Sequence, residues 1–452
     1  MPGRKARQAC FVLGLALLVG TAGCGNNNGG SSPLPPGTVA TGSTGVAVDG
    51  LRNLAFVARS DLLSSTTGNG VVDVLNVGVN PNKKDPIVAE IDLGHQDYPT
   101  GVAVDPANGR VYVVSGDNNH GGFLDIISDR TMPPKLLTAG APIPFPAGSD
   151  TGSVGQVIFD PKNHDAVVST TDANTCPSSG TCTGFSVFDL TSKTFGPIIQ
   201  ATPGTTGRDG ADAFALNPRT GVIIAPDDDI DPTLIAVDLP TSTRCTLTDS
   251  LISAQHDSDA SSFDPTTNLV VIGYYNQTSA VIVNLNGSSF TGTPPGCSLD
   301  EGGTPPNSVT VDLGAYDPGV AVNPVTHQAF MTGRGSPSQV ALVSLPKKAV
   351  TQIDSSMVSA VTSTLPNTPD GNNFDAEAYP YYTTVDVLHN RGYIVDDYSN
   401  YQWLAQVDLK AFEKNPSGIS TALPSGTCGT TVPTSYGCDN GNGVVYFPLP
   451  TP

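Results

Sequence analysis

One short pattern recurs seven times along this chain: a small apolar strand, then Asp or Asn, usually followed by Pro and a turn. The Asp or Asn residues, taken as position zero of each repeat, are Asp49, Asp105, Asp160, Asn217, Asp264, Asn323 and Asp386. Successive zero positions are separated by 56, 55, 57, 47, 59 and 63 residues, as expected for constant strands joined by loops of changeable length. An internal period of this size indicates a repeat architecture, in which each unit packs against its neighbours.

The fourth residue after each zero position supports this register. It is Gly, Asn or His in every repeat, and these residue types tolerate a positive φ well. The seven residues are Asn53, Gly109, His164, Gly221, Asn268, His327 and Asn390. A hairpin turn with one residue in the left-handed region explains all of them. The same position gives His164 and His327 a structural role in the turn, so we expect neither to be a ligand.

Each repeat continues with further short strands. The turn leads into a second apolar strand, such as RVYVV at 110–114, and a third strand ends near Asp, Asn or Ser. A more variable fourth strand follows, for example at 308–313 and at 350–354. Four short antiparallel strands repeated seven times predict an all-β fold, a seven-bladed β-propeller of four-stranded antiparallel blades. The sequence shows no helical periodicity of useful length.

The composition agrees with an all-β fold. Only four of the 41 acidic residues are Glu, so nearly all the acidity comes from Asp, which is common in turns and a poor helix former. The chain also contains 49 Gly and 39 Pro, which terminate strands and form turns. Much of the acidity is therefore expected to belong to turns.

The segments GVAVDP and RVYVV of the second repeat, with the recurring VDL, resemble the NHL and YVTN groups of β-propellers. The resemblance extends over essentially all of 38–452 and implies the propeller fold. Because such propellers serve as scaffolds, ligand binders and enzymes, it implies no single function. Two segments could supply the missing outer strand of the last blade, 38–44 and the apolar GVVYFPL at 443–449.

The N-terminus has the features of an export signal. Basic residues precede a short apolar run at 11–20 that is too short to span a bilayer, and small residues lead to Cys24. This arrangement resembles the lipobox of bacterial lipoproteins, in which the cysteine is acylated after cleavage. We therefore expect a signal peptide at 1–23, a flexible tether at 24–37 and the propeller at 38–452. These features predict a lipid-anchored location on the exported side of the cell envelope, with an ordinary secretory signal as the alternative.

Six cysteines remain after the signal peptide and Cys24 are set aside. They are Cys176, Cys182, Cys245, Cys297, Cys428 and Cys438. An even number in an exported chain favours disulfide bonds. The short separations suggest the pairs 176–182 and 428–438, which leaves 245–297 by elimination, although other pairings stay open.

Charge and strand order indicate where ligands could bind. The net charge of −20 disfavours nucleic acid as a partner. Connections between blades and between second and third strands lie on one end of a propeller, which we call the mouth face, and the +4 turns lie on the other. The acidic and histidine residues that precede the inner strands at the mouth face are Asp97, Asp209, Asp212, His256, Asp257, Asp259, Asp317 and Glu377.

These side chains could converge to hold a hard cation such as Ca²⁺ through oxygen ligands. The competing interpretation is that each closes its own local turn and binds nothing. No cofactor follows with certainty from the sequence, and Ca²⁺ is the one that the residue types suggest.

The sequence constrains the function of this chain less than it constrains the fold. No GxSxG, HExxH, P-loop or EF-hand motif is present in the sequence. We expect a non-catalytic binding or scaffold module whose ligand is a protein, a peptide or a carbohydrate, with membrane contact through the lipid anchor only. The alternatives are a metal-dependent lactonase or hydrolase at the acidic mouth and a structural surface-layer component.

Overall fold

The computed structural model describes residues 45–63, 67–79, 84–117, 121–146, 149–150, 155–172, 182–200, 214–226, 234–247, 251, 258–274, 277–286, 308–314, 316–334, 338–369, 383–395, 403–420, 438–439 and 443–449. For some strand residues among them only the backbone is described. All of them belong to one unit of internal contacts, Pro33–Pro452.

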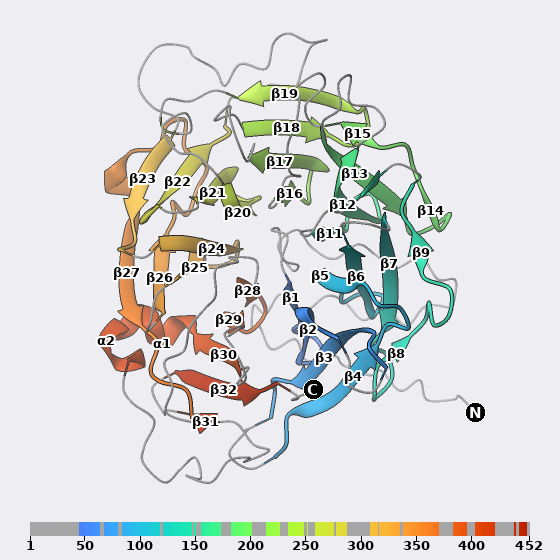
Figure 1. Ribbon diagram of the computed structural model, residues 1–452. Coiled ribbons are helices and arrows are strands. Elements are labelled where there is room, and N and C mark those ends of the chain that lie inside the picture. The colour runs from blue at the N-terminus through green and yellow to red at the C-terminus, as the bar shows by residue number, and fades with distance from the viewer. Residues whose placement is uncertain are drawn as a thin grey trace, which may run out of the picture. The chain divides into compact units, whose positions relative to one another are not determined.

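Seven antiparallel sheets form a ring, which confirms the predicted seven-bladed β-propeller (Figure 1). Blade 1 contains β1 (Val46–Asp49), β2 (Leu54–Leu63), β3 (Gly70–Asn76) and β4 (Ile87–Asp92), and blade 2 contains β5 (Tyr98–Asp105), β6 (Arg110–Asp117), β7 (Gly121–Ser128), β8 (Lys135–Leu136) and β9 (Ile143–Pro144). Blade 3 contains β10 (Ser149–Asp150), β11 (Val157–Asp160), β12 (Asp165–Asp172), β13 (Cys182–Asp189), β14 (Thr194–Phe195) and β15 (Ile199–Gln200).

The remaining blades have the same order from the channel outward. Blade 4 contains β16 (Ala215–Asn217), β17 (Val222–Pro226), β18 (Leu234–Asp238) and β19 (Thr243–Leu247), and blade 5 contains β20 (Ser258–Asp264), β21 (Leu269–Tyr274), β22 (Ser279–Asn284) and β23 (Ser308–Asp312). Blade 6 contains β24 (Tyr316–Asn323), β25 (Gln328–Arg334), β26 (Gln339–Ser344) and β27 (Ser359–Thr364), and blade 7 contains β28 (Thr383–Asp386), β29 (Arg391–Val395), β30 (Trp403–Asp408), β31 (Cys438–Asp439) and β32 (Val444–Pro448).

The hydrophobic core is divided among the interfaces between blades. The described residues form seven buried clusters, and each joins side chains of two adjacent blades. One of them packs Val46 and Val57 of blade 1 against Tyr393 and Phe447 of blade 7, which closes the ring. Every blade buries both faces of its sheet in this way, so the stability of each blade depends on the two blades beside it.

The ring closes with the C-terminal segment. Strand β32 pairs with β30 as the outer strand of blade 7, so of the two candidates for this strand 443–449 supplies it. Val444, Tyr446 and Phe447 of this strand are buried. Every described strand of blade 7 thus comes from the C-terminal part of the chain, and buried side chains of blades 7 and 1 pack against each other.

Two details differ from the sequence-based expectation. The outer strand of blade 6 is β27, not 350–354; residues before it form a short 3₁₀ helix, η1 (Ser355–Met357), capped by the Asp354 side chain. Two short helices, α1 (Leu409–Lys414) and α2 (Pro416–Ile419), follow β30. They bury Leu409, Phe412 and Ile419 against the interface of blades 6 and 7. Helices this short show no periodicity in a sequence.

Candidate functional site

The two ends of the ring have different chemistry. The strands of each blade alternate in direction, so the turns after the first and third strands lie at one end, which we call the turn face. The other two connections of each blade lie at the mouth face.

At the turn face, the zero-position side chains are buried and used locally. In every blade, the side-chain oxygen accepts a hydrogen bond from the backbone N–H two or three residues on. The seven residues at +4 have φ between 54° and 76°, as the register predicted. These turns are therefore structural, and their carboxylates are already hydrogen-bonded.

Side chains at this face also connect neighbouring blades. Nδ1 of His327 lies 2.8 Å from Oδ2 of Asp264 in the preceding blade, which confirms a structural role for that histidine. The Nδ2 of Asn323 donates to Oδ1 of Asn390 at 2.7 Å. The Arg52 guanidinium donates to the carbonyl oxygen of Pro106 at 2.8 Å. These contacts fix the spacing of the blades around the channel.

One buried carboxylate of the turn face, that of Asp129, shares its positively charged partner with a second carboxylate. Asp129 is fully buried, and its Oδ1 lies 3.6 Å from Nε of Arg52, which also pairs with Asp49. Burial raises the pKa of Asp129 to about 7, and the neighbouring Asp49 adds to the shift while Arg52 opposes it. The group therefore titrates near neutral pH.

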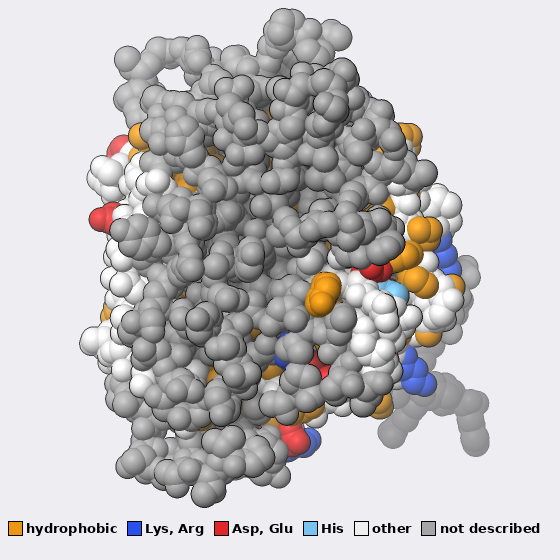
Figure 2. Space-filling view, in the orientation of Figure 1, with side chains coloured by type: hydrophobic (Ala, Val, Ile, Leu, Met, Phe, Trp, Pro, Cys, Tyr) orange, Lys and Arg blue, Asp and Glu red, His pale blue; other side chains and the backbone are white. Residues whose placement is uncertain are grey.

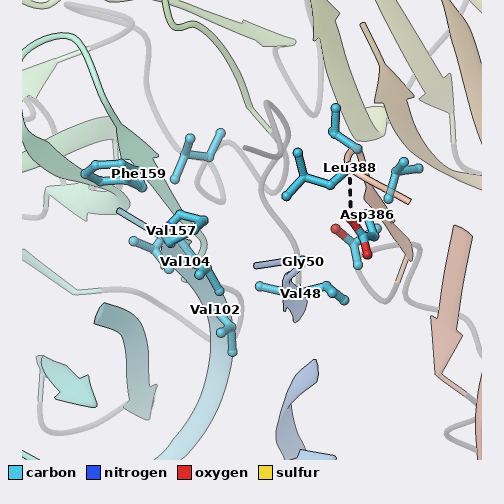
Figure 3. Close-up of a pocket in the computed structure, with 15 residues that line it drawn as sticks. Val48, Gly50, Val102, Val104, Val157, Phe159, Asp386 and Leu388 are labelled. Carbon is cyan, nitrogen blue, oxygen red and sulfur yellow. Dashed lines mark hydrogen bonds between the residues drawn. The ribbon is translucent and has the colours of Figure 1, made fainter. Parts of the chain in front are cut away.

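A small cavity lies at the turn end of the channel, and most of the residues that line it are apolar. This cavity of about 30 Å³, enough for one or two water molecules, is lined by residues of blades 1, 2, 3 and 7. Figure 3 shows Val104 and Phe159 on one side, Asp386 and Leu388 on the other, and Val48 between them. Asp386 is the single charged residue among the described lining residues, and it bonds to the N–H of Leu388 and to His389.

The mouth ends of the inner strands are irregular. Strands β5, β20 and β24 pair regularly with their partners near the turn face, but the register shifts near the mouth. Asp259 lies at the shift in β20, and Asp317 lies at the shift in β24. Such bulges change the direction of a side chain and are frequent next to functional sites.

A band of buried polar side chains lies within blades 1 to 3, between the strands that lead to the mouth. We call it the polar band; its members are Arg59, Asp73, His95, Ser115, Asp125, Gln156, Thr170 and Ser186. In blade 1, Nη1 of Arg59 donates to Oδ2 of Asp73 at 2.6 Å, with both side chains inside the protein. Burial raises the pKa of Asp73 to about 6, although the Arg59 charge and hydrogen bond oppose the shift.

His95 is held between two carboxylates. Its Nε2 lies 2.7 Å from Oδ2 of Asp125, and its Nδ1 lies 3.2 Å from Oδ2 of Asp97, close enough for an ion pair but not aligned as a hydrogen bond. The imidazole is 11% exposed and its ring lies 5.1 Å from that of Phe123. Burial lowers the pKa of His95, but the hydrogen bond and charge of Asp125, with the charge of Asp97, outweigh it and raise the pKa above its usual value. A ring held between two carboxylates is a positioning element rather than a general base.

Of the predicted mouth residues, only Asp97 has a described side chain, and it is buried beside His95. For Asp259 and Asp317 the backbone alone is described. Asp209, Asp212, His256, Asp257 and Glu377 lie outside the described residues. The same holds for Cys24 and for the side chains of Cys176, Cys182, Cys245, Cys297, Cys428 and Cys438, so the disulfide and acylation predictions stay predictions.

Within the part of the chain that the structure describes, no group of three or more His, Cys, Asp or Glu side chains is placed to hold a metal ion. Figure 2 shows the protein in the same orientation as Figure 1. Toward the right of this view, hydrophobic, acidic and histidine side chains lie next to one another. The convergence of acidic residues on a cation thus stays a prediction about residues outside the described ranges.

Sequence reasoning missed Arg59, Asp73 and Asp125 of the polar band. Asp73 in GVVDVLN and Asp125 in GGFLDIIS occupy the same place in the third strand of their blades, three residues before Asn76 and Ser128. An Asp inside an apolar strand is a signal, because a buried carboxylate requires a partner. The partners, Arg59 and His95, come from other strands and could not be assigned from spacing.

Comparisons with known proteins assign this chain to no family. No family model matches the chain, and no curated protein matches it either. Among solved structures, a putative 6-phosphogluconolactonase from Bacteroides uniformis is 12% identical, with a TM-score of 0.47 over 82% of this chain and 92% of that one. TolB from Acinetobacter baumannii is 10% identical, with a TM-score of 0.38 over 88% of this chain and 80% of that one. Similarity this low carries no argument about activity.

No helix among the described residues has the length and apolarity needed to cross a bilayer.

Proposed function

We propose that this chain is a non-catalytic binding module of the cell envelope, anchored by lipid on Cys24, which binds a protein, peptide or carbohydrate ligand at its mouth face. The observation that carries the proposal is the contrast between the two ends of the ring. At the turn face, all seven blades repeat the same hydrogen-bonded turn. At the mouth face the register of the inner strand shifts in blades 2, 5 and 6, and the residues at the shift differ from blade to blade: Thr100, Asp259, and Asp317 with Pro318.

In a repeat protein, features that every unit shares maintain the scaffold, and features of single units are available for specific recognition. The shifts place Asp259 and Asp317 at the irregular ends of their strands. Acidic residues outside the described ranges precede neighbouring inner strands in the sequence. These features support a blade-specific polar surface at the mouth.

The polar band supports a binding role more than a catalytic one. Of the described histidines, His95 alone precedes an inner strand, and both of its ring nitrogens face carboxylates. General-base catalysis requires a free ring nitrogen within reach of the substrate proton. With a carboxylate beside each ring nitrogen, the largely buried imidazole is placed to hold the connection between blades 1 and 2 rather than to approach a substrate.

The test uses the unit Pro33–Pro452, which contains every described strand and all seven core clusters. Arrays of immobilised oligosaccharides and peptides are probed with this protein, and lactone and ester substrates are incubated with it in Ca²⁺ and in EDTA. We expect saturable binding to a restricted set of array ligands and no turnover. Turnover that requires Ca²⁺ would contradict the proposal and favour a metal-dependent hydrolase; the absence of any array ligand would favour a structural component.

A further inference from the structure

The exposed basic residues gather on one face of this acidic protein. Ten described Lys and Arg side chains are exposed, and every one lies in a connection of the turn face or at its edge: Lys84, Arg130, Lys135, Lys162, Lys193, Arg219, Lys347, Lys348, Lys410 and Lys414. Four described acidic side chains are exposed there, Asp85, Asp354, Asp408 and Glu413. The exposed charged side chains of the turn face are thus mainly basic on a chain whose net charge is −20, while buried and half-buried carboxylates such as Asp49, Asp105 and Asp189 lie beneath them.

Exposed apolar side chains occupy the same face. Leu51 is 56% exposed, Val325 is 66% exposed and Leu388 is 48% exposed, and each stands two residues after the zero position of its blade. These three blades, 1, 6 and 7, are neighbours in the ring (Figure 1). Met132 and Met357, also exposed, lie in turn-face connections of blades 2 and 6.

The hydrogen bonds that form these turns do not require an apolar side chain two residues after the zero position. The hydrogen bonds of the turn use the zero-position side chain and backbone N–H groups, so the side chain two residues on is unconstrained. In blades 3 and 4 the same position holds Lys162 and Arg219. The turn tips around the channel therefore form an apolar arc over blades 6, 7 and 1 and a basic arc over blades 3 and 4.

From these observations we infer that the turn face docks onto an anionic phospholipid surface. Basic side chains attract acidic headgroups, and exposed Leu, Val and Met side chains enter the boundary between headgroups and acyl chains. This contact is independent of the ligand at the mouth face and adds to the anchor on Cys24. It leaves the mouth face directed away from the bilayer.

The overall negative charge does not prevent this contact. Strand β6 contains eight residues, so the two ends of a blade are separated by roughly 25 Å at the usual rise per residue. The Debye length is about 10 Å in 0.1 M salt, so carboxylates at the mouth are screened from a bilayer at the turn face. The exposed side chains of the turn face, ten basic and four acidic, are the charged groups that approach the headgroups most closely.

Vesicle sedimentation of the unit Pro33–Pro452, which lacks Cys24, tests the inference apart from the anchor. The vesicles contain phosphatidylcholine with or without phosphatidylglycerol. We expect binding to the anionic vesicles only, weakened by salt. The pair Lys162→Gln and Arg219→Gln should reduce the binding constant roughly tenfold. The pair Leu51→Ser and Val325→Ser should reduce it about fivefold.

Two matched controls lie away from the turn face. Gln96→Glu with Thr310→Glu makes the same change in net charge, and Tyr98→Ser removes an exposed apolar side chain at the mouth. Both should bind vesicles like wild type. Equal binding to neutral vesicles, no binding at all, or equal losses in controls and turn-face variants would overturn the inference. None of these outcomes bears on ligand binding to the arrays, so the two proposals fail separately.

Discussion

Nδ1 of His327 lies 2.8 Å from Oδ2 of Asp264, and the two residues come from adjacent blades. His327 stands at +4 of blade 6 with φ 56°, and Asp264 is the zero-position residue of blade 5. The Asp264 carboxylate also accepts the N–H of Thr266 in its own turn. One buried carboxylate therefore stabilises a turn and joins it to the next blade.

Replacing His327 by Asn should lower the free energy of unfolding by about 1–3 kcal/mol, because Oδ2 of Asp264 would lose its partner while buried. Asn tolerates the positive φ, so the turn itself is retained. The control is His164→Asn, since His164 has the same turn conformation but packs its ring edge-on against Phe159. Denaturant unfolding measures both, and equal losses would show that the contact between the blades adds nothing.

Gly392→Ala should destabilise the interface between blades 6 and 7. A Cβ at this position would lie 2.4 Å from ring atoms of the fully buried Phe330. Overpacking of this kind costs about 1–3 kcal/mol. Gly196→Ala is the control, because the nearest atom to its Cβ would be 3.8 Å away. Thermal unfolding should show a clear loss for the first variant and little change for the second; similar melting temperatures would contradict the packing described.

The Arg59–Asp73 pair should behave as a unit. Asp73→Asn leaves the buried Arg59 guanidinium without its carboxylate partner and should cost about 3–5 kcal/mol. The double change Arg59→Met with Asp73→Leu removes both charges and should cost much less. A double-mutant cycle by denaturant unfolding checks this, and additive losses would show that the two side chains are not coupled.

Stability should decrease as pH rises from about 5 to about 8. Burial raises the pKa of both Asp129 and Asp165 to about 7, and the pKa of His95 is also raised in the folded protein. A group with a raised folded pKa holds its proton more tightly when folded. The group therefore stabilises the fold fully at a pH below its pKa in the unfolded chain. This stabilisation is lost as the pH rises through its pKa in the folded protein. Asp129→Asn should flatten the pH dependence of the melting temperature, and an unchanged slope would exclude Asp129 as a contributor.

The sequence predicted the turns, in which the interacting residues are close together along the chain. The zero-position residue and the residue at +4 lie within one turn, so Asp264 and Asn268 could be assigned from spacing alone, and the structure confirms their geometry. Contacts between strands were not accessible in this way. His95 and Asp125 are 30 residues apart and Arg59 and Asp73 are 14 apart, so neither pair forms a recognisable motif.

Outer strands were the weakest part of the prediction for a physical reason. In β27 every residue is half-buried or exposed, so the strand lacks a strong alternation of apolar and polar residues. The apolar segment at 350–354 lies instead before η1, where Ile353 is buried in the core between blades 5 and 6. Burial alone therefore does not distinguish a strand from an anchored loop.

Binding at the mouth face is tested most directly by calorimetric titration of the strongest array ligand into three proteins. They are the wild-type unit Pro33–Pro452, the pair Asp257→Asn with Asp259→Asn, and Asp129→Asn at the turn face. We predict stoichiometric binding to wild type and to Asp129→Asn, and a loss of affinity of at least tenfold in the mouth-face pair. Unchanged affinity in the mouth-face pair together with a loss in Asp129→Asn would contradict the assignment of the ligand to the mouth face.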